Sequence, residues 1–328
     1  MKIGMTYDLR KDYIELGFSE EETAELDTAE TIEAKEYVLC KLGHNTERIG
    51  GIKSLVNRLA KGERWDLVFN ISEGIKGISR ESQVPALLDA YDIPYTFSDP
   101  LVLALSLQKD MAKRVIRDLG IPTPKFVVIH DIDEIEKHDL DFPLFVKPIA
   151  EGTSKGIDNM SKVYNLGELE TVSKKLLAKF KEPVLVEEYL PGREFTVGMV
   201  GTGKAAKVVG VMEIIIKGSD EMGGYSYNNK KNYLETVSYV PVSCSISVEC
   251  SDIASKVWKG LGCRDGGRVD VKMDSNGIPS FMEVNPLAGL NPVFSDLPIL
   301  ASMYGISYEE LIKSILDSAI QNINAERV

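Results

Sequence analysis

Three oxygen-bearing side chains near the C-terminal end of the chain are spaced so that they can meet. Asp270 lies in one apolar run, and Glu283 and Asn285 lie in the next. Residues 274–277 between the runs read Asp-Ser-Asn-Gly, a turn sequence that predicts a hairpin of two strands. Side chains alternate along a strand, so Glu283 and Asn285 share a face, and Asp270 can join them across the hairpin. Two carboxylates and an amide oxygen are hard ligands that suit Mg²⁺ bridging phosphates, rather than zinc or copper.

A hairpin whose acids simply face solvent is the alternative interpretation. The residues beside the three side chains are apolar: Val269, Val271, Phe281, Met282 and Val284. Such flanking residues indicate buried strands, and acids inside a buried sheet need partners such as a metal ion. We therefore favour a metal site.

A lysine and a glycine-flanked loop form a second candidate. Lys147 ends the apolar run 143–148, and residues 152–156 then read Gly-Thr-Ser-Lys-Gly. Such a loop offers backbone N–H groups and hydroxyls to phosphate oxygens, while the lysine supplies a positive charge. The spacing is not that of a Walker A loop. A glycine loop taken alone is more often an ordinary turn.

A third candidate is the strand predicted over residues 183–189, with the residues that follow it. Exposed backbone at the end of a strand can contact the edge of an adenine ring, and Glu194 could accept hydrogen bonds from ribose hydroxyls. An edge strand with ordinary surface acids is the alternative.

The first 95 residues alternate between strand and helix patterns. We predict strands over 2–7 and 66–70, and helices over 27–42, with Asp27 as the cap, and over 83–91. This order predicts a parallel sheet with helices on its faces. The Glu-rich insert at 16–25 is predicted to be a solvated loop or a short surface helix.

The rest of the chain combines further helices with a strand-rich C-terminal part. Residues 223–233, rich in Gly, Tyr, Asn and Lys, are predicted to form a mobile loop. Helices are predicted over 100–120, 167–180, 294–304 and 307–323. Strands are predicted over 125–130, 143–148, 183–189, 194–200, 206–216 and 236–242, besides the hairpin.

Composition limits the classes of function. The 328 residues suit two or three domains, and the net charge of −12 argues against general nucleic-acid binding. No apolar run approaches the ~20 residues that a membrane span needs, and the first residues lack a signal-peptide pattern. The four cysteines have neither CxxC spacing nor accompanying histidines. We therefore expect a cytoplasmic protein with reduced thiols.

Together these motifs resemble the ATP-grasp superfamily, and within it the D-alanine–D-alanine ligases of peptidoglycan synthesis. The resemblance covers nearly the whole chain and is strongest over 142–156, 184–198 and 258–298. It implies an α/β fold, α+β in its C-terminal part, with three domains. These would be an N-terminal parallel-sheet preATP-grasp domain at 1–98, a central ATP-grasp subdomain at 99–186 and a C-terminal catalytic subdomain at 187–328.

The resemblance also implies roles for individual residues. Arg268 and the backbone N–H of Gly289 would form an oxyanion hole, with Ser295 and Leu297 near the acceptor carboxylate. Ser154 would take part both in catalysis and in covering the phosphates. Two Mg²⁺ ions (or Mn²⁺) would be held by Asp270, Glu283 and Asn285. The residues assigned to ATP are Lys109, Lys147, Thr153, Ser154, Glu187, Glu188, Leu190, Glu194 and Lys230.

The chain departs from the family mainly on the side of the amino-acid substrates. Residues 7–10, Tyr-Asp-Leu-Arg, and the acidic insert replace a segment that contains serine and glutamate in the family. Residues 80–83, Arg-Glu-Ser-Gln, replace a Gly-Glu-Asp-Gly turn. Asp27 or Glu30 could instead anchor the ammonium group of the first amino acid. ATP use is therefore better supported than specificity for D-alanine.

The expected activity is ATP-dependent joining of a small carboxylate and an amine, with amino acids as the expected substrates. The reaction would pass through an acyl phosphate and release ADP and phosphate. Two alternatives stay open: an ATP-grasp ligase for a different carboxylate or a peptide, and a nucleotide-binding protein without turnover. Homodimers are usual in the resembled family, so a homodimer is one expectation, with no nucleic-acid or membrane partner.

Overall fold

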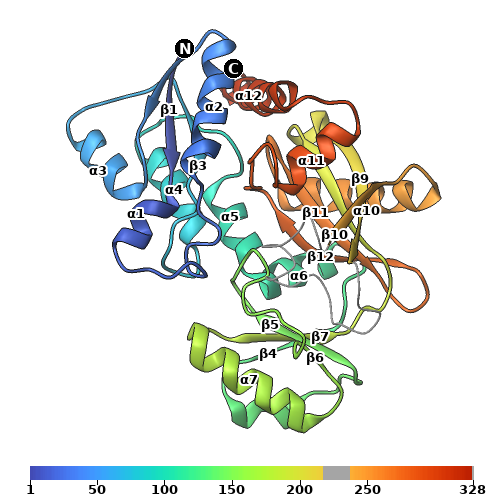
Figure 1. Cartoon of the computed structure of the whole chain (residues 1–328). Helices are drawn as coiled ribbons and strands as arrows, with labels where there is room; N and C mark the ends of the chain where they lie inside the picture. Colours follow the sequence, from blue (N-terminus) through green and yellow to red (C-terminus); the bar gives the residue numbers. More distant parts are fainter. Residues whose placement is uncertain (217–236, 327–328) are drawn as a thin grey trace.

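A computed structural model describes residues 1–216 and 237–326, and these residues build three β-sheets with helices packed on them (Figure 1). The loop predicted at 223–233, including Lys230, lies outside the described residues.

The N-terminal sheet is parallel, with strand order β2-β1-β3. Its strands alternate with helices along the chain, and a helical crossover is what brings neighbouring strands parallel. The strands are β1 (Lys2–Tyr7), β2 (Asn45–Arg48) and β3 (Leu67–Ile71). The helices are α1 (Arg10–Glu15), α2 (Ala29–Lys41), α3 (Ile52–Ala60), the 3₁₀ helix η1 (Arg80–Ser82) and α4 (Gln83–Ala90). The parallel-sheet prediction is confirmed, although β2 and α3 are absent from the predicted elements.

Two helices follow where one was predicted. The chain leaves helical geometry at Gln108, whose ψ is 93°, and this separates α5 (Pro100–Leu107) from α6 (Lys109–Asp118). The break sets Lys109 at the start of α6, where its backbone N–H donates to the carbonyl of Ile149.

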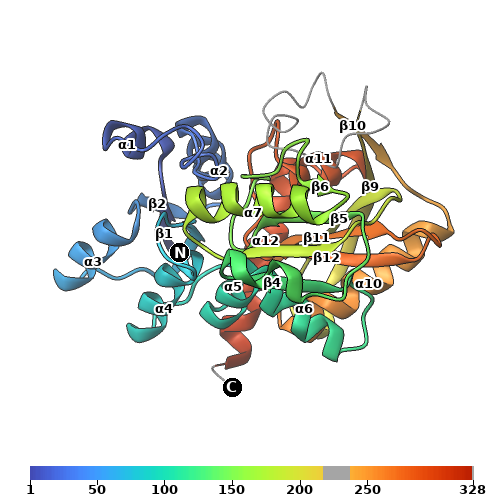
Figure 2. The ribbon, with the colours of Figure 1, turned by 90° about the horizontal axis from the view of Figure 1, so that it is seen from below.

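The central sheet is antiparallel, with order β4-β7-β5-β6. It contains β4 (Phe126–Ile129), β5 (Leu144–Pro148), β6 (Lys162–Val163) and β7 (Val184–Glu188), with the 3₁₀ helix η2 (Ile132–Lys137). The helix α7 (Leu166–Phe180) covers its outer face, turned away from the rest of the molecule (Figures 1 and 2). The domain boundary predicted at 186/187 falls inside β7.

The C-terminal sheet is antiparallel, with order β10-β9-β8-β11-β12. Its strands are β8 (Glu194–Val200), β9 (Lys207–Ile216), β10 (Val237–Pro241), β11 (Gly266–Met273) and β12 (Pro279–Asn285). The 3₁₀ helix η3 (Gly203–Ala205) and the helices α10 (Ser245–Leu261), α11 (Asp296–Met303) and α12 (Tyr308–Glu326) complete this part. The predicted hairpin is confirmed, with Gly277 at φ +77° in its turn.

The helix α10 was not predicted, although it supports the hairpin directly. Its buried face includes Cys250, Ala254, Val257 and Trp258, the 3.6-residue spacing of an amphipathic helix. The Trp258 ring lies against Gly267 of β11, where a Cβ would approach the ring within 2.8 Å. Trp258 therefore supports β11, the strand that carries Arg268 and Asp270, by packing against its backbone.

The C-terminal helix α12 packs against α2 of the N-terminal part (Figure 1). One apolar core runs through both, from Ile3 and Leu39 to Ile312 and Leu316. The two ends of the chain are therefore joined by a shared core, while the central sheet has a core of its own.

Replacement of Trp258 by alanine tests this support. The side chain is fully buried and its Nε1 donates to the carbonyl of Gly201 at 3.0 Å. We expect Trp258→Ala to lower the free energy of unfolding by about 3–5 kcal/mol, measured by urea denaturation with circular dichroism. Val248→Ala on the exposed side of α10 is the matched control and should stay within about 0.5 kcal/mol of wild type. Equal losses in both variants would contradict this account of α10.

Candidate active site

Two adjoining cavities lie where the three parts of the chain meet. The larger has a volume of about 420 Å³ and the smaller about 100 Å³. Both are lined by Lys109, Gly152, Arg268 and Glu283, so these residues form the boundary between them. A ligand in one cavity would therefore meet a ligand in the other beside Arg268 and Glu283, at the end of the β11–β12 hairpin that lies away from its turn.

The hairpin brings the predicted oxygen donors together. In the register of β11 and β12, Asp270 lies opposite Glu283 and Arg268 lies opposite Asn285. Asp270 accepts hydrogen bonds from Thr196 at 2.8 Å and from the Asn285 amide at 3.4 Å, and Arg268 also donates to it. Asp270, Glu283 and Asn285 therefore share one face of the sheet, as the alternation of side chains predicts.

The donor set fits a divalent cation of the Mg²⁺ type. Burial raises the pKa of Asp270 to about 6, with Arg268 opposing the rise and Glu283 adding to it, so a bound cation would favour the ionised carboxylate. Within the described residues no three His, Cys, Asp or Glu side chains are grouped to hold a metal. A cation here would therefore need the amide oxygen of Asn285 beside the two carboxylates.

Lysines surround a buried carboxylate on the wall of the smaller cavity. Glu187 lies between Lys147, at 2.6 Å, and Lys113, at 3.0 Å, and all three side chains are buried. Burial lowers the pKa of Lys113 to about 8, against the attraction of Glu187. Two lysines to one carboxylate leave this wall positive whenever both are protonated, which suits an anionic ligand. The sequence did not indicate this role for Lys113.

The rest of the smaller cavity is lined by residues of two sheets. Lys147 and Glu187 come from the central sheet, and Asp270 and Lys272 come from the C-terminal sheet. Glu194 pairs with Lys272 at 3.0 Å. Most residues that the resemblance assigned to ATP line this cavity: Lys109, Lys147, Ser154, Glu187, Glu188, Leu190 and Glu194.

The glycine-flanked loop bends sharply between the cavities. Thr153 and Ser154 have φ values of +49° and +55°, a region that residues with a Cβ rarely adopt. Thr153 faces the larger cavity and Ser154 the smaller one. A Cβ on Gly152 would lie 2.1 Å from Oε1 of Glu25, so a larger residue here would displace this carboxylate of the acidic insert. The loop is thereby held at the boundary of both cavities.

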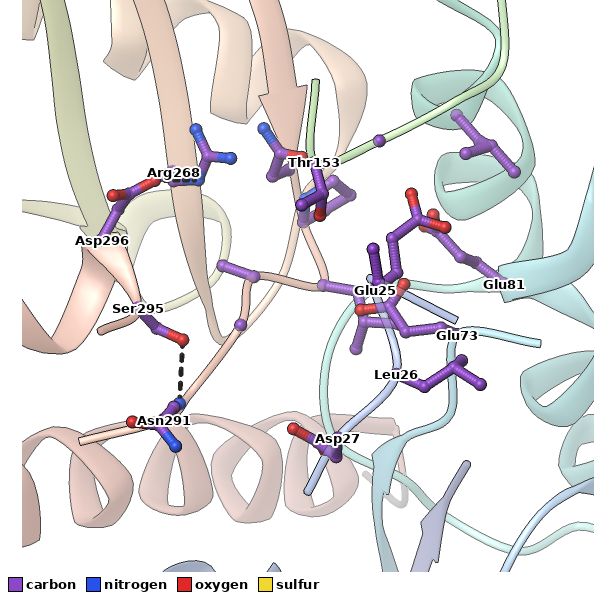
Figure 3. A pocket seen from close by; sticks show the side chains of 18 of the residues that line it. Glu25, Leu26, Asp27, Glu73, Glu81, Thr153, Arg268, Asn291, Ser295 and Asp296 are labelled. Carbon is purple, nitrogen blue, oxygen red and sulfur yellow. Dashed lines mark hydrogen bonds and ion pairs between the residues drawn. The ribbon is translucent and has the colours of Figure 1, made fainter. Parts of the chain in front are cut away.

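One side of the larger cavity carries the predicted oxyanion and acceptor groups. Arg268, Ser295 and Asp296 lie together in Figure 3, and Ser295 Oγ accepts from the backbone N–H of Asn291 at 2.9 Å. A Cβ on Gly289 would come within 2.9 Å of that same Oγ. Leu297 is buried in α11 and does not line the cavity.

The opposite side is an acidic end, formed by Glu25, Asp27, Glu73 and Glu81 (Figure 3). Glu25 pairs with Arg80 and Lys155, each at 3.0 Å. Asp27 pairs with Lys35 at 2.8 Å and does not cap α2, which begins after Thr28.

Two expectations from the sequence need correction here. Glu30 is exposed on α2 and does not line the cavity, so its position is wrong for an ammonium anchor. The acidic insert is not a fully solvated loop, because Glu25 is drawn inward by two cations. Its apolar neighbours Ala24 and Leu26 were the signal that could have identified it.

The remaining two acids of this end resist ionisation. Burial raises the pKa of Glu81 to about 7; Glu25 adds to the rise, while Arg80 opposes it. Burial and the neighbouring Glu81 carboxylate raise the pKa of Glu73 well above its ordinary range. By contrast, Arg80 and Lys155 outweigh burial and lower the pKa of Glu25 to about 2.

Two antiparallel sheets enclosing a lysine-lined cavity, with an acidic hairpin at its mouth, define an ATP-grasp protein. The chain belongs to the D-alanine–D-alanine ligase family, since the family model described as "D-ala D-ala ligase C-terminus" matches residues 115–317. As a member of this family it is an ATP-dependent ligase.

Proteins that are similar in sequence over most of the chain support this assignment. A D-alanine–D-alanine ligase from Aquifex aeolicus is 34% identical over 279 residues, covering 85% of this chain and 90% of that protein. A protein of Sinorhizobium fredii named y4sG is 34% identical over 294 residues, covering 86% of this chain and 84% of its own.

A solved structure shares the fold. The D-alanine–D-alanine ligase from Bacillus anthracis complexed with ATP superposes with a TM-score of 0.75 at 23% identity, covering 99% of each chain. None of the described helices of the present chain combines the length and the apolar character that crossing a membrane requires.

The raised pKa of Glu81 makes a prediction about stability. The folded protein holds this proton up to about pH 7, whereas the ordinary pKa is 4.5, so wild-type stability falls as pH rises through this window. Glu81→Gln cannot lose a proton and escapes the fall. The variant should gain on the order of 1–2 kcal/mol over wild type between pH 4.5 and pH 8, measured by urea unfolding. Glu33→Gln, on the exposed face of α2, should show no such drift with pH. A constant difference between Glu81→Gln and wild type would show that Glu81 ionises normally.

Proposed function

We propose that this ligase joins the carboxylate of one amino acid to the amine of another through an acyl phosphate, releasing ADP and phosphate. The observation that carries the proposal is the continuity of the two cavities. A nucleotide in the smaller one would end at Lys109, Arg268 and Glu283, where the carboxylate of a substrate in the larger one would lie.

In the first step a carboxylate oxygen bonds to the γ-phosphorus of ATP while the bond to the ADP oxygen breaks. Phosphoryl transfer depends mainly on positioning and on neutralising charge. Lys147 and Lys109 would hold the phosphates, because Lys147 stands on the positive wall and Lys109 reaches the boundary. The Lys109 Nζ is already fixed there by the Glu151 carbonyl at 2.6 Å and lies 3.9 Å from Glu283.

Asp270, Glu283 and Asn285 would hold Mg²⁺ at the same place. When bound, the ion would neutralise the phosphate oxygens as charge moves between them. Thr153 and Ser154, on the loop between the cavities, would cover the phosphates and keep water away from the acyl phosphate.

In the second step the amine nitrogen of the acceptor bonds to the acyl carbon and phosphate leaves, taking up the amine proton. The oxyanion that forms on the way would be stabilised by Arg268 and by the N–H of Gly289, and one such donor is typically worth roughly 3 kcal/mol. Arg268 is held for this role between Asp270 and Asp296, its Nε lying 3.7 Å from the Asp296 carboxylate. Asp296 follows Ser295 at the start of α11, where the acceptor would bind.

The acidic end supports amino acids as the substrates. An ammonium group carried by the first substrate would face Glu25, Asp27, Glu73 and Glu81, while its carboxylate would face Lys109 and Arg268 on the other side. A carboxylate substrate without an amine would leave these acids without a partner, which makes it the weaker candidate.

A coupled assay of ADP release tests the proposed function. The full chain with ATP and Mg²⁺ is given D- and L-amino acids singly and in pairs. We expect ADP and phosphate to appear in equal amounts, together with a dipeptide detected by mass spectrometry. ADP release that no amino acid stimulates would reject the proposal, and nucleotide binding without turnover would favour the non-catalytic alternative.

Glu283→Gln tests the assignment of the hairpin. The substitution keeps the size of the side chain but removes a charge, and metal-borne charge stabilisation is worth several kcal/mol. We therefore expect kcat to fall by roughly 100-fold or more, with an unchanged circular dichroism spectrum. Glu249→Gln, an exposed acid on α10, is the matched control and should retain wild-type kcat. Unchanged turnover in Glu283→Gln would show that the metal assignment is wrong.

A further inference from the structure

The acidic end of the larger cavity carries more carboxyl groups than cations. Glu25 and the neighbouring Glu151 share two cations, Arg80 and Lys155. Asp27 has Lys35. Arg10 and Glu20 also line the cavity, but their charges are opposite and leave the balance unchanged.

Glu73 and Glu81 are the two acids left over. Among the described residues neither carboxylate has a hydrogen bond or a cation within ion-pair distance, although both line the cavity. They come from different segments, Glu73 from the loop after β3 and Glu81 from η1, so their meeting is a product of the fold. Figure 3 shows both side chains beside Glu25, on the side away from Arg268 and Asp296.

Burying acids in a cavity wall without partners is unfavourable, and the fold has not placed a lysine or arginine between them. The cations that do line the cavity near the reacting end, Lys109 and Arg268, lie at the nucleotide boundary instead. A cationic group brought by a ligand would pair with these two carboxyl groups and favour their ionised form. The cavity also has room for it, because about 420 Å³ falls within the range of pockets that hold ligands larger than alanine.

We propose that the first substrate is a diamino acid: an amino acid whose side chain carries a second cationic nitrogen, bound between Glu73 and Glu81. This inference rests on the proposed ligase function and names the substrate class of the same site. The α-ammonium group would face Glu25 and Asp27, whose charges are partly balanced already. The second cation would meet the carboxyl groups of Glu73 and Glu81 and ionise them, and the substrate carboxylate would point to Lys109 and Arg268.

The experiment compares substrates that differ only in that charge. Initial rates of ADP release are measured for matched pairs of equal chain length: 2,3-diaminopropionate with 2-aminobutyrate, 2,4-diaminobutyrate with norvaline, and ornithine with norleucine. Lysine is paired with 2-aminoheptanoate, and every compound is tested in D and L form, alone and with alanine as acceptor. In at least one pair we expect the diamino acid to have a kcat/KM at least tenfold higher.

Two variants connect any preference to the proposed residues. Glu73→Gln and Glu81→Gln keep the shape of the side chains and should each lower the ratio of kcat/KM within the preferred pair at least fivefold. They should do so mainly through KM for the diamino acid, with KM for ATP unchanged. Glu33→Gln, exposed on α2, should keep the wild-type ratio. If a variant does not fold, the wild-type ratio alone still decides, because it needs no substitution.

The outcomes separate this inference from the proposed function. Equal or faster turnover of the neutral members of all pairs would overturn the diamino-acid proposal while leaving the ligase intact. A preference that survives both substitutions would also overturn it, because the charge would then be recognised elsewhere. No turnover with any amino acid would reject the ligase function itself.

Discussion

The structure depends on a pair of like charges placed face to face inside a sheet. Asp270 and Glu283 are cross-strand neighbours on β11 and β12, and like charges in that position repel. The surrounding residues offset part of the repulsion: Arg268 pairs with Asp270, Thr196 donates to it, and Lys109 approaches Glu283. Asp296, also beside Arg268, brings a third carboxylate to these two cations, and a divalent ion could offset the remaining repulsion. The hairpin therefore gives up some stability at the place where the two cavities meet, and the ion that we propose there would restore part of it.

Buried ion pairs are also found at the boundary between the two cavities. Glu187 is buried between two lysines, and Glu25 ties the N-terminal part to Lys155 of the glycine-flanked loop. These ion pairs connect segments that lie far apart in the sequence. Removing one partner of a buried ion pair leaves the other charge unpaired in a low-dielectric environment, which is strongly unfavourable. The relative placement of the three parts is thus fixed at the very residues that face the ligands.

Local patterns predicted the parts of the fold that local rules govern. The Asn-Gly turn and the alternation around Asp270 were sufficient for the β11–β12 hairpin, and the strand with Lys147 was predicted to within one residue. The helix α10 was missed because its sequence is rich in Ser and β-branched residues, which have modest helix propensity, so its helicity depends on the burial of Trp258. The break at Gln108 was missed because no Gly or Pro marks it, and it accompanies a contact of Lys109 with the distant residue Ile149.

The acidic end was the part of the site that could not be predicted from the sequence. Asp27 and Glu30 were the natural candidates because they begin a helix after the altered N-terminal segment. In the structure Asp27 forms an ion pair with Lys35, and Glu30 is exposed. Glu25, Glu73 and Glu81 belong to three separate segments, and no spacing along the chain links them. Their convergence follows only from the packing of η1 and the insert against the loop at Gly152.

The core shared by α2 and α12 has a consequence for how this chain can be divided. Ile3 and Leu39 are covered by Ile312 and Leu316, and the Asn291 amide donates to the Thr31 hydroxyl at 2.7 Å inside the same layer. A fragment ending near residue 98 would lose that cover and expose these apolar side chains to water. The strands of the parallel sheet are all made early, but during synthesis the apolar core beside them is completed only when the last helix has been made.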